Sequence, residues 1–562
     1  MWQQHYDPVG GSLIASSLVA AIPIVVLSFM LAVRRKPAWQ AALSALGVAF
    51  VIALVAYRMP VSLALMAALT GAAYGIFPIS WIVFSSILLY RLAVDTGKFE
   101  IIKDSVGGLT TDRRLQALFI AFSFGAFIEG AAGFGAPVAV AGAMLTGLGF
   151  PPFQAAAICL IANTSPVAFG SIGIPVITLA GTTGMPILPL SAMIGRLSAI
   201  ISLVIPTYLA VVLAGWQRTL DVWPAVAICT LSFALVQLYV SNAIGPELTD
   251  ILSALFCIVA MVLVMKFWKP RAIYRLERDA EQSAGITARR HSTREIFVAW
   301  LPYLLLVVFV LMWGVVSFKR EVDAFTNGLL PAFLPRSSTV MNGLLVPGLH
   351  NMVTRMPPVT PASSPYPAVY TFNWLSSGGT ACFLAGVTFA LLMRLSPRRF
   401  AGVYRGTFRQ LAKPILTIAS MLALAYLMNY SGMTSTLGIA LAATGRTFPF
   451  FSAILGWLGV FLTGSDTSAN ALFGNLQMIT ANQLDLNPVL TTSVNSAAGV
   501  TGKMIALPSI AVAVAATGLT SADEGRLFRF TLAHSIGLAC AMGIVAVVFA
   551  YLLPGLVPVV QK

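Results

Sequence analysis

Two glycine-rich stretches interrupt long apolar runs in this chain: FIEGAAGFGAPV at residues 127–138 and FLTGSDTSAN at residues 461–470. Their first residues, Phe127 and Phe461, lie 334 positions apart, and each is followed three residues later by a glycine. Further matches lie 332 or 333 positions apart: Asn163 with Asn495, Gly170 with Gly502, and Pro175 with Pro508. Because the order is kept and the offset is nearly constant, the sequence predicts a duplicated unit.

Glycine and proline inside an apolar segment break a helix and free backbone N–H and C=O groups. In a membrane such groups are tolerated only where protein or a water-filled cavity satisfies them. In secondary transporters, paired broken helices from two repeats form the transport site, and their half-helix N-termini present partial positive charge to an anion. The alternative is that the glycines only allow close helix packing. We favour a transport site because both copies also contain polar residues.

The composition is that of a protein embedded in lipid. Hydrophobic residues make up 58% of the chain and charged residues 9%, whereas an ordinary soluble chain carries about 25% charged residues. Apolar runs of about 20 residues, the length of a membrane span, recur along almost the whole sequence and leave no room for a soluble catalytic domain. We therefore expect an all-α polytopic membrane protein and not an enzyme.

Basic residues indicate the topology rather than a nucleic-acid partner. The net charge is +15, but the lysines and arginines cluster in short loops, as they do on the cytoplasmic side of membrane proteins. The first apolar run, 13–33, ends on three basic residues and is expected to be a retained first span. The five cysteines match no metal-binding spacing, so they are expected to be small buried hydrophobes and no metal site is predicted.

The chain divides into two transmembrane halves. The expected order is an N-terminal half at 1–265 with the broken segment 125–182, a cytoplasmic loop at 266–296, and a C-terminal half at 297–562 with the broken segment 459–519. The basic run 394–413 should also face the cytoplasm. Segment 319–367 is rich in Pro, Ser, Thr and Asn and poor in charge, so it should be periplasmic. The mixed charge of 97–114 leaves that stretch unplaced.

Three charged side chains stand isolated in or beside the two broken segments: Glu129, Asp466 and Lys503. A charge at membrane depth costs between about 2.5 and 17 kcal/mol, so such residues are functional candidates. Because burial favours the neutral form of a carboxyl group, Asp466 and Glu129 are candidates to carry a coupling proton. Lys503 is expected either to neutralise a carboxylate substrate or to pair with an acid. A structural ion pair, for example with Asp466, is the alternative, and Glu129 has the further alternative of a position near the membrane interface.

Neutral polar residues of the two segments supply hydrogen-bond donors and acceptors that suit a small hydroxylated anion. The candidates for substrate binding, besides Lys503, are Gly130, Asn163, Thr164, Ser165, Ser465, Thr467, Ser468 and Asn495. The polar side chains among them are equally suited to capping a broken helix. Arg196 and His534 rank below them, since a lone histidine in an apolar span usually makes a helix–helix hydrogen bond.

Several long motifs resemble those of the bacterial L-lactate permease family. They are WQQ at 2–4 with YDP at 6–8, FIEGAAGFGAPV at 127–138, NTSPVAFG at 163–170, SN at 241–242 with GPEL at 245–248, RMPP at 355–358, GWLGVFLTGSDTS at 456–468 and GVTGKMI at 499–505. The resemblance runs from the N-terminus to about residue 554, and motifs of this length and spread are highly specific. After GVTGKMI this chain has Ala506-Leu507-Pro508 where the family has a more polar Ser-Pro-Gln, which leaves the preference among hydroxy acids open.

The resemblance implies a secondary transporter of the bacterial inner membrane that imports L-lactate, and also D-lactate and glycolate, by proton symport, with no cofactor beyond the proton gradient. It also implies an elevator-type carrier with scaffold helices and two repeats, which we expect to be inverted and to contain broken helices or re-entrant hairpins. A sodium-coupled carrier and a passive channel for small monocarboxylates are the alternatives. Neither the preferred hydroxy acid nor an oligomeric state follows from the sequence.

Overall fold

The structure of the protein is a computed structural model that describes residues 1–559 except 108, 134, 277–290, 330–334, 339 and 341. Much of the expected cytoplasmic loop 266–296 and part of the expected periplasmic segment 319–367 lie outside the described residues. Phe134, in the first glycine-rich stretch, lies outside them as well. The described part is nearly all helical.

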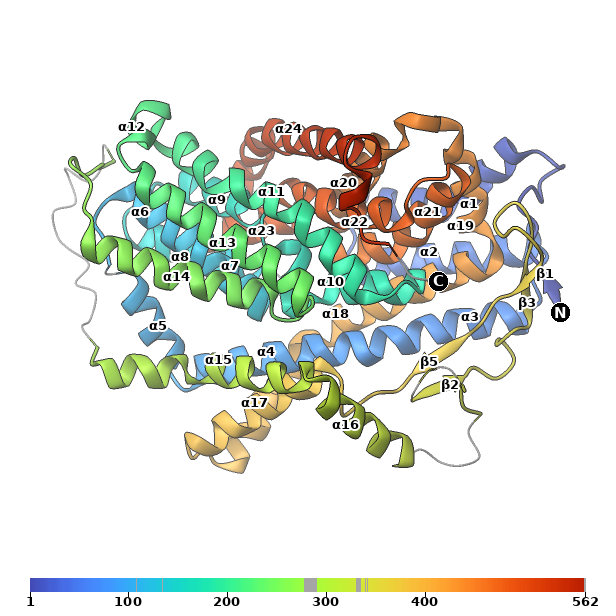
Figure 1. The fold of residues 1–562 in the computed structure, drawn as a ribbon, viewed down its shortest axis with the longest axis horizontal. Helices are drawn as coiled ribbons and strands as arrows, with labels where there is room; N and C mark the ends of the chain where they lie inside the picture. Colours follow the sequence, from blue (N-terminus) through green and yellow to red (C-terminus); the bar gives the residue numbers. More distant parts are fainter. Residues whose placement is uncertain are drawn as a thin grey trace.

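Helices follow one another with short connections along both halves of the chain (Figure 1). The first half contains β1 (Trp2–Gln3), α1 (Leu13–Ser28), η1 (Phe29–Val33), α2 (Ala38–Val55), α3 (Val61–Tyr74), η2 (Gly75–Ser80), α4 (Trp81–Asp95), α5 (Lys98–Gly107), α6 (Arg113–Gln116), η3 (Ala117–Phe124), α7 (Gly125–Ala131), α8 (Ala136–Gly147), α9 (Pro152–Ala162), η4 (Val167–Phe169), α10 (Gly170–Thr183), α11 (Ile187–Ala214), α12 (Trp216–Leu220), α13 (Trp223–Ala243) and α14 (Thr249–Phe267). The second half contains α15 (Thr293–Gly314), α16 (Val316–Leu329), β2 (Gly343–Leu345), β3 (Val353–Arg355), β4 (Ser364–Pro365), β5 (Val369–Thr371), α17 (Gly378–Leu392), α18 (Pro397–Ser431), α19 (Met433–Leu441), η6 (Ala442–Thr447), α20 (Phe448–Thr463), α21 (Asp466–Gln483), α22 (Pro488–Gly499), η7 (Val500–Ile505), α23 (Leu507–Thr517), η8 (Ser521–Asp523), α24 (Glu524–Tyr551) and η9 (Pro554–Leu556).

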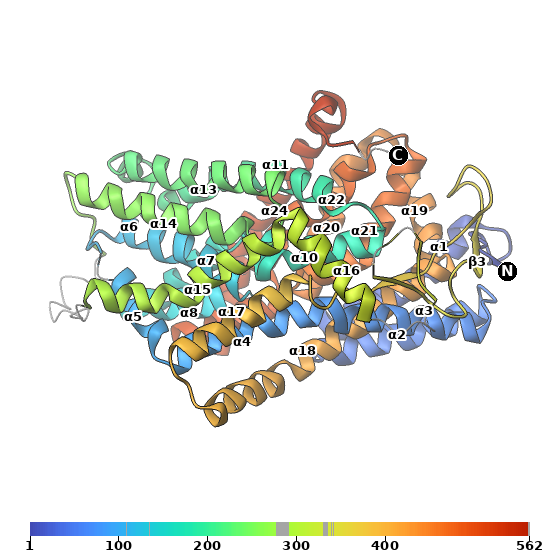
Figure 2. The ribbon, with the colours of Figure 1, turned by 60° about the horizontal axis from the view of Figure 1, so that its bottom comes forward.

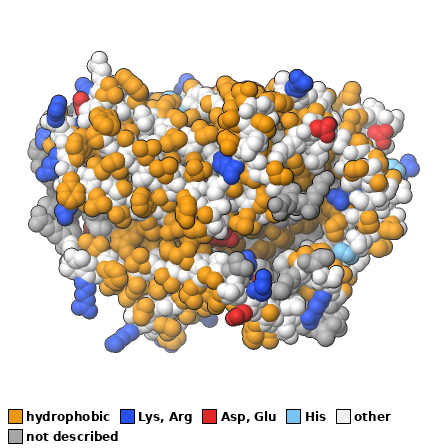
Figure 3. All heavy atoms as spheres, in the orientation of Figure 1, with side chains coloured by type: hydrophobic (Ala, Val, Ile, Leu, Met, Phe, Trp, Pro, Cys, Tyr) orange, Lys and Arg blue, Asp and Glu red, His pale blue; other side chains and the backbone are white. Residues whose placement is uncertain are grey.

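The surface and the helix lengths are those of a membrane protein. The described residues contain 11 helices long and apolar enough to cross a membrane, or up to 13 if each bent pair is one span. The first of them, Leu13–Val33, has the predicted bounds. Hydrophobic side chains cover most of the face drawn in Figure 3, and large apolar side chains such as Ile14 and Phe267 are 76% and 80% exposed. The expectation of an all-α polytopic membrane protein is confirmed.

Two groups of helices enclose the broken segments. The 35-residue helix α18 packs against α2, α3 and α4, and α17 packs between α4 and α15. A second group, α11, α13 and α14, lies on the other side of the molecule, above α4 and α15 in the view of Figure 2. Helix α10 contacts α4, α11, α14 and α21. It therefore links both groups to the second broken segment.

Both glycine-rich stretches interrupt helices, as the sequence predicts. One break separates α7 from α8 and the other separates α20 from α21. Downstream of each break a further pair is bent, by 62° between α9 and the segment Val167–Thr183, and by 47° between Pro488–Ile505 and α23. The same succession of break and bend occurs in both halves. The symmetry of the repeats, their inversion and the elevator movement stay predictions.

The N-terminus is held by the segment expected to be periplasmic. Strand β1 pairs in parallel with β3, which pairs on its other side with β4. Figure 1 draws this sheet and the N-terminus at the right end of the long axis, with α5, α6 and α12 at the left end.

The stretch 97–114, unplaced from the sequence, lies beside the loop that precedes α15, and the end of α4 just before the stretch lies beside the start of α18. His291 contacts Asp104 of α5 at 2.8 Å, and Arg399 contacts Asp95 at the end of α4 at 2.7 Å. The stretch therefore shares one side of the molecule with the starts of α15 and α18. That this side is cytoplasmic stays a prediction.

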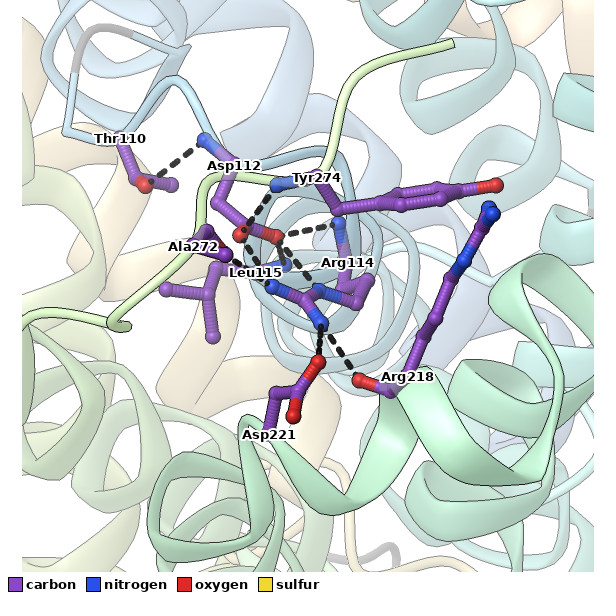
Figure 4. Close-up of polar contacts among 8 residues, drawn as sticks. All are labelled: Thr110, Asp112, Arg114, Leu115, Arg218, Asp221, Ala272 and Tyr274. Atoms are coloured by element: carbon purple, nitrogen blue, oxygen red, sulfur yellow. Dashed lines mark hydrogen bonds and ion pairs between the residues drawn. The ribbon is translucent and has the colours of Figure 1, made fainter.

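A buried ion pair holds α6, which leads through η3 into the first broken segment. Asp112 caps α6 through the N–H of Arg114, and its carboxylate accepts from the Arg114 guanidinium at 2.7 Å and from the N–H of Tyr274 at 3.0 Å. The guanidinium also donates to the carbonyl oxygens of Ala272 and Arg218 (Figure 4). Since Asp112 and Arg114 are both 1% exposed, this cluster joins α6, α12 and the segment after α14 inside the protein.

Candidate functional site

A cavity of about 210 Å³ lies where the broken segments of both halves meet. Its wall contains residues of η4, α7, α10, α21, η7 and α23, together with the breaks themselves. Five of the residues predicted for the site are part of this wall within the described ranges: Glu129, Ser465, Asp466, Thr467 and Lys503. The structure therefore brings together residues from the two predicted segments around one cavity.

Four helices begin at the cavity wall. Gly135 is the N-cap of α8, Ser465 is the N-cap of α21, and the right-handed part of α10 begins at Ile174 after the left-handed residues 171–173. Ser509 lies in the first turn of α23. The first N–H groups of a helix have no intrahelical acceptor, and the helix dipole places roughly half a positive charge at this end. Four such ends around one cavity favour an anion as the bound group.

Glycine is required at two of these turns. Gly135 and Gly464 have φ angles of +81° and +71°, in the left-handed region that glycine enters without steric cost. Gly464 also lies against the start of α23, where an added Cβ would be 3.2 Å from Cγ of Pro508. These glycines reverse the chain at the wall of the cavity, which explains why the breaks fall there.

The start of α10 is left-handed over three residues. Ser171, Ile172 and Gly173 have φ angles of +48°, +61° and +71°, and a β-branched residue in this region is an outlier whose strain is of the order of 1–3 kcal/mol. The Ser171 hydroxyl donates to the carbonyl oxygen of Ala132 at 3.0 Å. Gly173 lies against Pro246, where an added Cβ would be 2.8 Å from the carbonyl carbon. Ser171 lines the cavity, and no motif in the sequence marks it.

An ion pair joins the two halves at the cavity. The Lys503 ammonium donates to Oε1 of Glu129 at 2.8 Å, and the two side chains are 11% and 3% exposed. Lys503 thus pairs with Glu129 and not with Asp466, the partner suggested from the sequence. The sequence near Lys503 could not reveal this pairing, because Glu129 lies in the other half of the chain. An added Cβ on Gly170 would be 2.6 Å from Oε1 of Glu129, so this glycine leaves room for the carboxylate.

Asp466 is the first residue of α21 and faces the same cavity. Its Oδ2 accepts from the Ser496 hydroxyl at 2.6 Å and from the Asn470 amide at 3.4 Å. Asn470 also donates to the carbonyl oxygen of Pro175 at 3.1 Å, which connects Asp466 to α10. The position of this carboxyl group is therefore determined by donors from its own half and by a contact with the other.

A third buried carboxyl group, Asp250, was not predicted. It lies in the first turn of α14, is 1% exposed, and neither of its oxygens has a hydrogen-bond partner in the described part of the chain. An added Cβ on Gly130 would be 2.8 Å from Cβ of Asp250. Asp250 therefore packs against the residue next to Glu129, and it interacts with the charges of Glu129 and Lys503. In the sequence it resembles an ordinary acidic residue at the start of a helix, so no signal singled it out.

The other predicted residues of the first half lie outside the cavity wall. Gly130 packs against Asp250. Asn163 and Thr164 are buried after the end of α9, and their side-chain polar atoms have no hydrogen-bond partner among the described residues. The Ser165 hydroxyl bonds to that of Ser202 on α11. Asn163, Thr164 and Ser165 belong to the bend between α9 and α10, outside the wall.

Two predicted residues of the second half support the wall from behind. The Ser468 N–H donates to the side chain of the N-cap Ser465 at 3.3 Å. The Asn495 amide donates to Asn470 at 2.9 Å and accepts from Gln477 at 3.1 Å. The hydrogen bonds of Ser468 and Asn495 thus hold the start of α21 in place.

The lower-ranked residues have structural partners. His534 bonds to the Tyr208 hydroxyl on α11, as expected of a histidine in an apolar span. Arg196 donates to the side chain of Asn242 at 3.1 Å. Neither belongs to the cavity wall.

Comparison with known proteins gives long matches. A family model described as L-lactate permease matches residues 16–553. An L-lactate permease of Bacillus subtilis (strain 168) is 47% identical over 98% of this chain and 100% of its own length. The glycolate permease GlcA of Escherichia coli (strain K12) is 44% identical over 99% of both chains, and the L-lactate permease of the same strain is 41% identical over 99% of this chain and 100% of its own.

Two solved transporter structures also align with the chain. The YdaH transporter of Alcanivorax borkumensis covers 85% of this chain and 86% of its own at 13% identity and a TM-score of 0.43. For MtrF of Neisseria gonorrhoeae the shares are 87% and 85%, at 14% identity and a TM-score of 0.44. The family model and the relatives at 41–47% identity cover nearly the whole sequence. This chain, a multi-pass transporter of the bacterial inner membrane, belongs to the L-lactate permease family.

Proposed function

We propose that the protein imports L-lactate, and also D-lactate and glycolate, by proton symport. Membership of the family and the names of the relatives, L-lactate permeases and a glycolate permease, support the substrate class. The observation that carries the proposal is the cavity wall, where helix N-termini and one lysine lie beside buried carboxyl groups.

The cavity suits a small carboxylate with a hydroxyl group. Its volume of about 210 Å³ is below the roughly 300–1,000 Å³ of pockets for drug-sized ligands. Lys503 and the four helix N-termini attract a carboxylate. The hydroxyls of Ser465 and Thr467 at the start of α21 supply partners for the 2-hydroxyl group.

The charge balance favours a proton as the second transported species. Within the described residues, three buried carboxyl groups, those of Glu129, Asp466 and Asp250, lie around the single ammonium group of Lys503. A bound lactate carboxylate adds one negative charge to this site, and one further proton on the acids offsets it. Because uncompensated charge is costly away from water, each lactate takes up one proton, whichever acid holds it.

Lys503 connects the two binding events. A lactate carboxylate that binds the ammonium group competes with Glu129, its partner at 2.8 Å. Glu129 and Asp466 both line the cavity, so a proton entering with the substrate reaches these two carboxyl groups first. We therefore assign proton exchange with the cavity to Glu129 and Asp466.

Uptake into liposomes that contain the purified protein tests this function. With an alkaline interior, labelled L-lactate is expected to accumulate about tenfold for each pH unit of gradient, because a tenfold ratio corresponds to about 1.4 kcal/mol. A sodium gradient at equal pH is expected to have no effect. Accumulation that follows sodium and ignores pH contradicts proton symport and supports the sodium-coupled alternative.

A carrier differs from a channel in counterflow. Liposomes loaded with unlabelled L-lactate at equal pH on both sides are expected to accumulate labelled L-lactate transiently, since carriers exchange substrate across a closed site. Simple equilibration of the label without this overshoot supports the channel alternative.

The hydroxyl contact is tested by competition. Propionate has the carbon skeleton of lactate without the 2-hydroxyl group, so it is expected to inhibit uptake about tenfold more weakly, the value of one good hydrogen bond. Glycolate and D-lactate are expected to inhibit uptake as hydroxy acids do. Equal inhibition by propionate and lactate contradicts a role for Ser465 and Thr467 in binding the hydroxyl.

A further inference from the structure

Asp250 has less support for a negative charge than the other two buried carboxyl groups. Glu129 has the Lys503 ammonium at 2.8 Å, and Asp466 accepts two side-chain hydrogen bonds. Asp250 has no ion-pair partner in the part of the chain that is described, and neither of its oxygens accepts a hydrogen bond of normal geometry there. An unpaired carboxylate is so costly at 1% exposure that a bound proton is the alternative.

The elements packed against α14 supply no cation to Asp250. These elements are α7, α10, α13 and η3, and among their described residues the only charged one is Glu129, on α7. The thiols of Cys229 on α13 and Cys257 on α14 lie 3.7 Å apart and contact each other. Tyr239 on α13 is 68% exposed and points away. Glu247, just before α14, lines a different cavity.

Gln237 is the polar group that faces Asp250 from α13. It is fully buried, its Oε1 accepts from the Ser202 hydroxyl at 2.7 Å, and its amide nitrogen has no partner among the described residues. Gln237 lies close enough to influence the Asp250 carboxyl group, although no hydrogen bond of normal geometry joins the two side chains. Asp250 therefore lies in a pocket that tolerates both its neutral form and, with a small movement of Gln237, its ionised form.

Asp250 is also separated from the cavity by one residue. It packs on Gly130, while the adjacent Glu129 forms part of the wall. Oε2 of Glu129 has no partner in the described ranges, so this carboxyl group has a free oxygen for a proton. A proton that enters at Glu129 and passes to Asp250 is no longer in contact with the cavity.

We propose that Asp250 holds the proton that accompanies each substrate anion. The inference rests on the proposed proton symport and names the residue that stores the proton. The carboxylate of Asp250 gains a proton through Glu129 when the site faces the more acidic side, and the resulting neutral acid releases it by the same route on the other side. Asp250 acts through Glu129, without touching the substrate.

The coupling follows from charge. A lactate carboxylate at Lys503 weakens the influence of this cation on Glu129 and Asp250, and so it strengthens proton binding at Asp250. By linkage, a proton on Asp250 strengthens lactate binding by the same factor. Substrate and proton therefore bind together.

The test compares Asp250→Asn with the wild type in liposomes. An asparagine resembles the protonated acid but cannot release a proton. The variant is expected to keep L-lactate counterflow at equal pH, while its accumulation in a pH gradient falls to the level without a gradient. Glu247→Gln, which removes a nearby acid that lines another cavity, is expected to retain both activities.

Uptake by the wild type and by Asp250→Asn distinguishes a failure of the Asp250 assignment from a failure of proton symport itself. If the wild type ignores the pH gradient, proton symport itself is wrong. If the wild type follows the gradient and Asp250→Asn follows it equally, symport stands and Asp250 is not the proton store. Loss of gradient-driven accumulation with counterflow intact supports the assignment.

Infrared difference spectra between acidic and alkaline pH decide the case in which Asp250→Asn loses both activities. The wild type is expected to show the carbonyl stretch of a protonated buried carboxylic acid, and Asp250→Glu is expected to shift this band. A band that is unmoved in Asp250→Glu belongs to another carboxyl group and overturns the proposal.

Discussion

The ion pair between Glu129 and Lys503 joins side chains 374 positions apart and forms part of the cavity wall. Lys503→Gln or Glu129→Gln alone leaves a buried charge without its partner and is expected to lower the free energy of unfolding by about 3–5 kcal/mol. The double variant is expected to regain most of this stability, because no charge is then unpaired, but to transport no L-lactate. Thermal unfolding in detergent and uptake in liposomes measure the two effects on the same four proteins.

An exposed ion pair is the matched control. Lys103 contacts Glu100 at 2.7 Å, with side chains 31% and 61% exposed, and a pair of this kind contributes about 0–1 kcal/mol. Lys103→Gln is expected to leave stability and uptake unchanged. If the double variant of Glu129 and Lys503 recovers uptake along with stability, the pair is only structural.

Some residues of the site could be predicted, because a charged residue that stands alone in an apolar run can be recognised in the sequence. Glu129, Asp466 and Lys503 were found in this way, and all three line the cavity. Their pairing was not predictable, since it depends on how the two halves meet. Asp250 was not predicted because an acidic residue in the first turn of a helix is common. Only its packing against Gly130 shows that it lies next to Glu129.

At the level of elements, the left-handed start of α10 is expected to determine the shape of the cavity. Gly173→Ala adds a Cβ 2.8 Å from the backbone of Pro246 at a φ angle of +71°. The backbone strain costs about 1–2 kcal/mol, and the overlap with a main chain that cannot rotate away costs about 1–3 kcal/mol more. The variant is therefore expected to be less stable in thermal unfolding and to take up L-lactate at about a tenth of the wild-type rate or less.

Gly184, at the other end of the same helix, provides the control. It has the same φ angle of +71°, and no atom lies within 4 Å of an added Cβ. Gly184→Ala carries only the backbone strain, so it is expected to lose some stability and to keep its uptake rate. Equal loss of uptake in the two variants means that strain, and not the contact with Pro246, is responsible.

The cluster around Arg114 is expected to be structural. Arg114→Met leaves the carboxylate of Asp112, which is 1% exposed, without its cation, and loss of one partner of such a pair costs about 3 kcal/mol or more. The melting temperature in detergent is expected to fall, while protein that remains folded keeps its affinity for L-lactate, because neither residue lines the cavity.

A variant of Arg218 distinguishes the contribution of the Asp112–Arg114 ion pair to stability from that of the contact with the Tyr274 ring. Its exposed guanidinium lies 5.2 Å from the centre of the Tyr274 ring, a contact that contributes about 0.5–1 kcal/mol. Arg218→Met keeps the carbonyl oxygen that accepts from Arg114 and is expected to change the melting temperature little. A drop as large as that of Arg114→Met assigns the stability to the ring contact.

The breaks were predictable as elements, whereas their exact paths were not. Glycine and proline in matched positions indicated where helices would end, and Gly135 and Gly464 adopt the left-handed angles that such turns need. Nothing in the sequence predicts that Ile172 adopts such an angle too, since a β-branched residue disfavours it. Tertiary contacts override this preference, as the packing of Gly173 on Pro246 illustrates.

The site belongs to the whole molecule, because neither half contains a complete wall. Glu129 on α7 meets Lys503 on η7, and Asn470 on α21 reaches the carbonyl oxygen of Pro175 on α10. Composition and motifs predicted a membrane transporter and its family. Contacts between the two halves depend on how some 560 residues pack in three dimensions. Motifs and spacing along one sequence therefore do not predict these contacts.

The charge count around the cavity also predicts how transport responds to voltage. If each lactate anion enters with one proton, the loaded site carries no net charge relative to the site without substrate, and a membrane potential does no work on it. A potassium diffusion potential, set with valinomycin at equal pH, is therefore expected to drive no accumulation of L-lactate, whereas a pH gradient does. A charge that does cross the membrane is driven by about 2.3 kcal/mol per 100 mV, so a second proton per lactate would give clear accumulation at an inside-negative potential. That result would mean that the three buried acids around Lys503 take up more than one proton for each lactate.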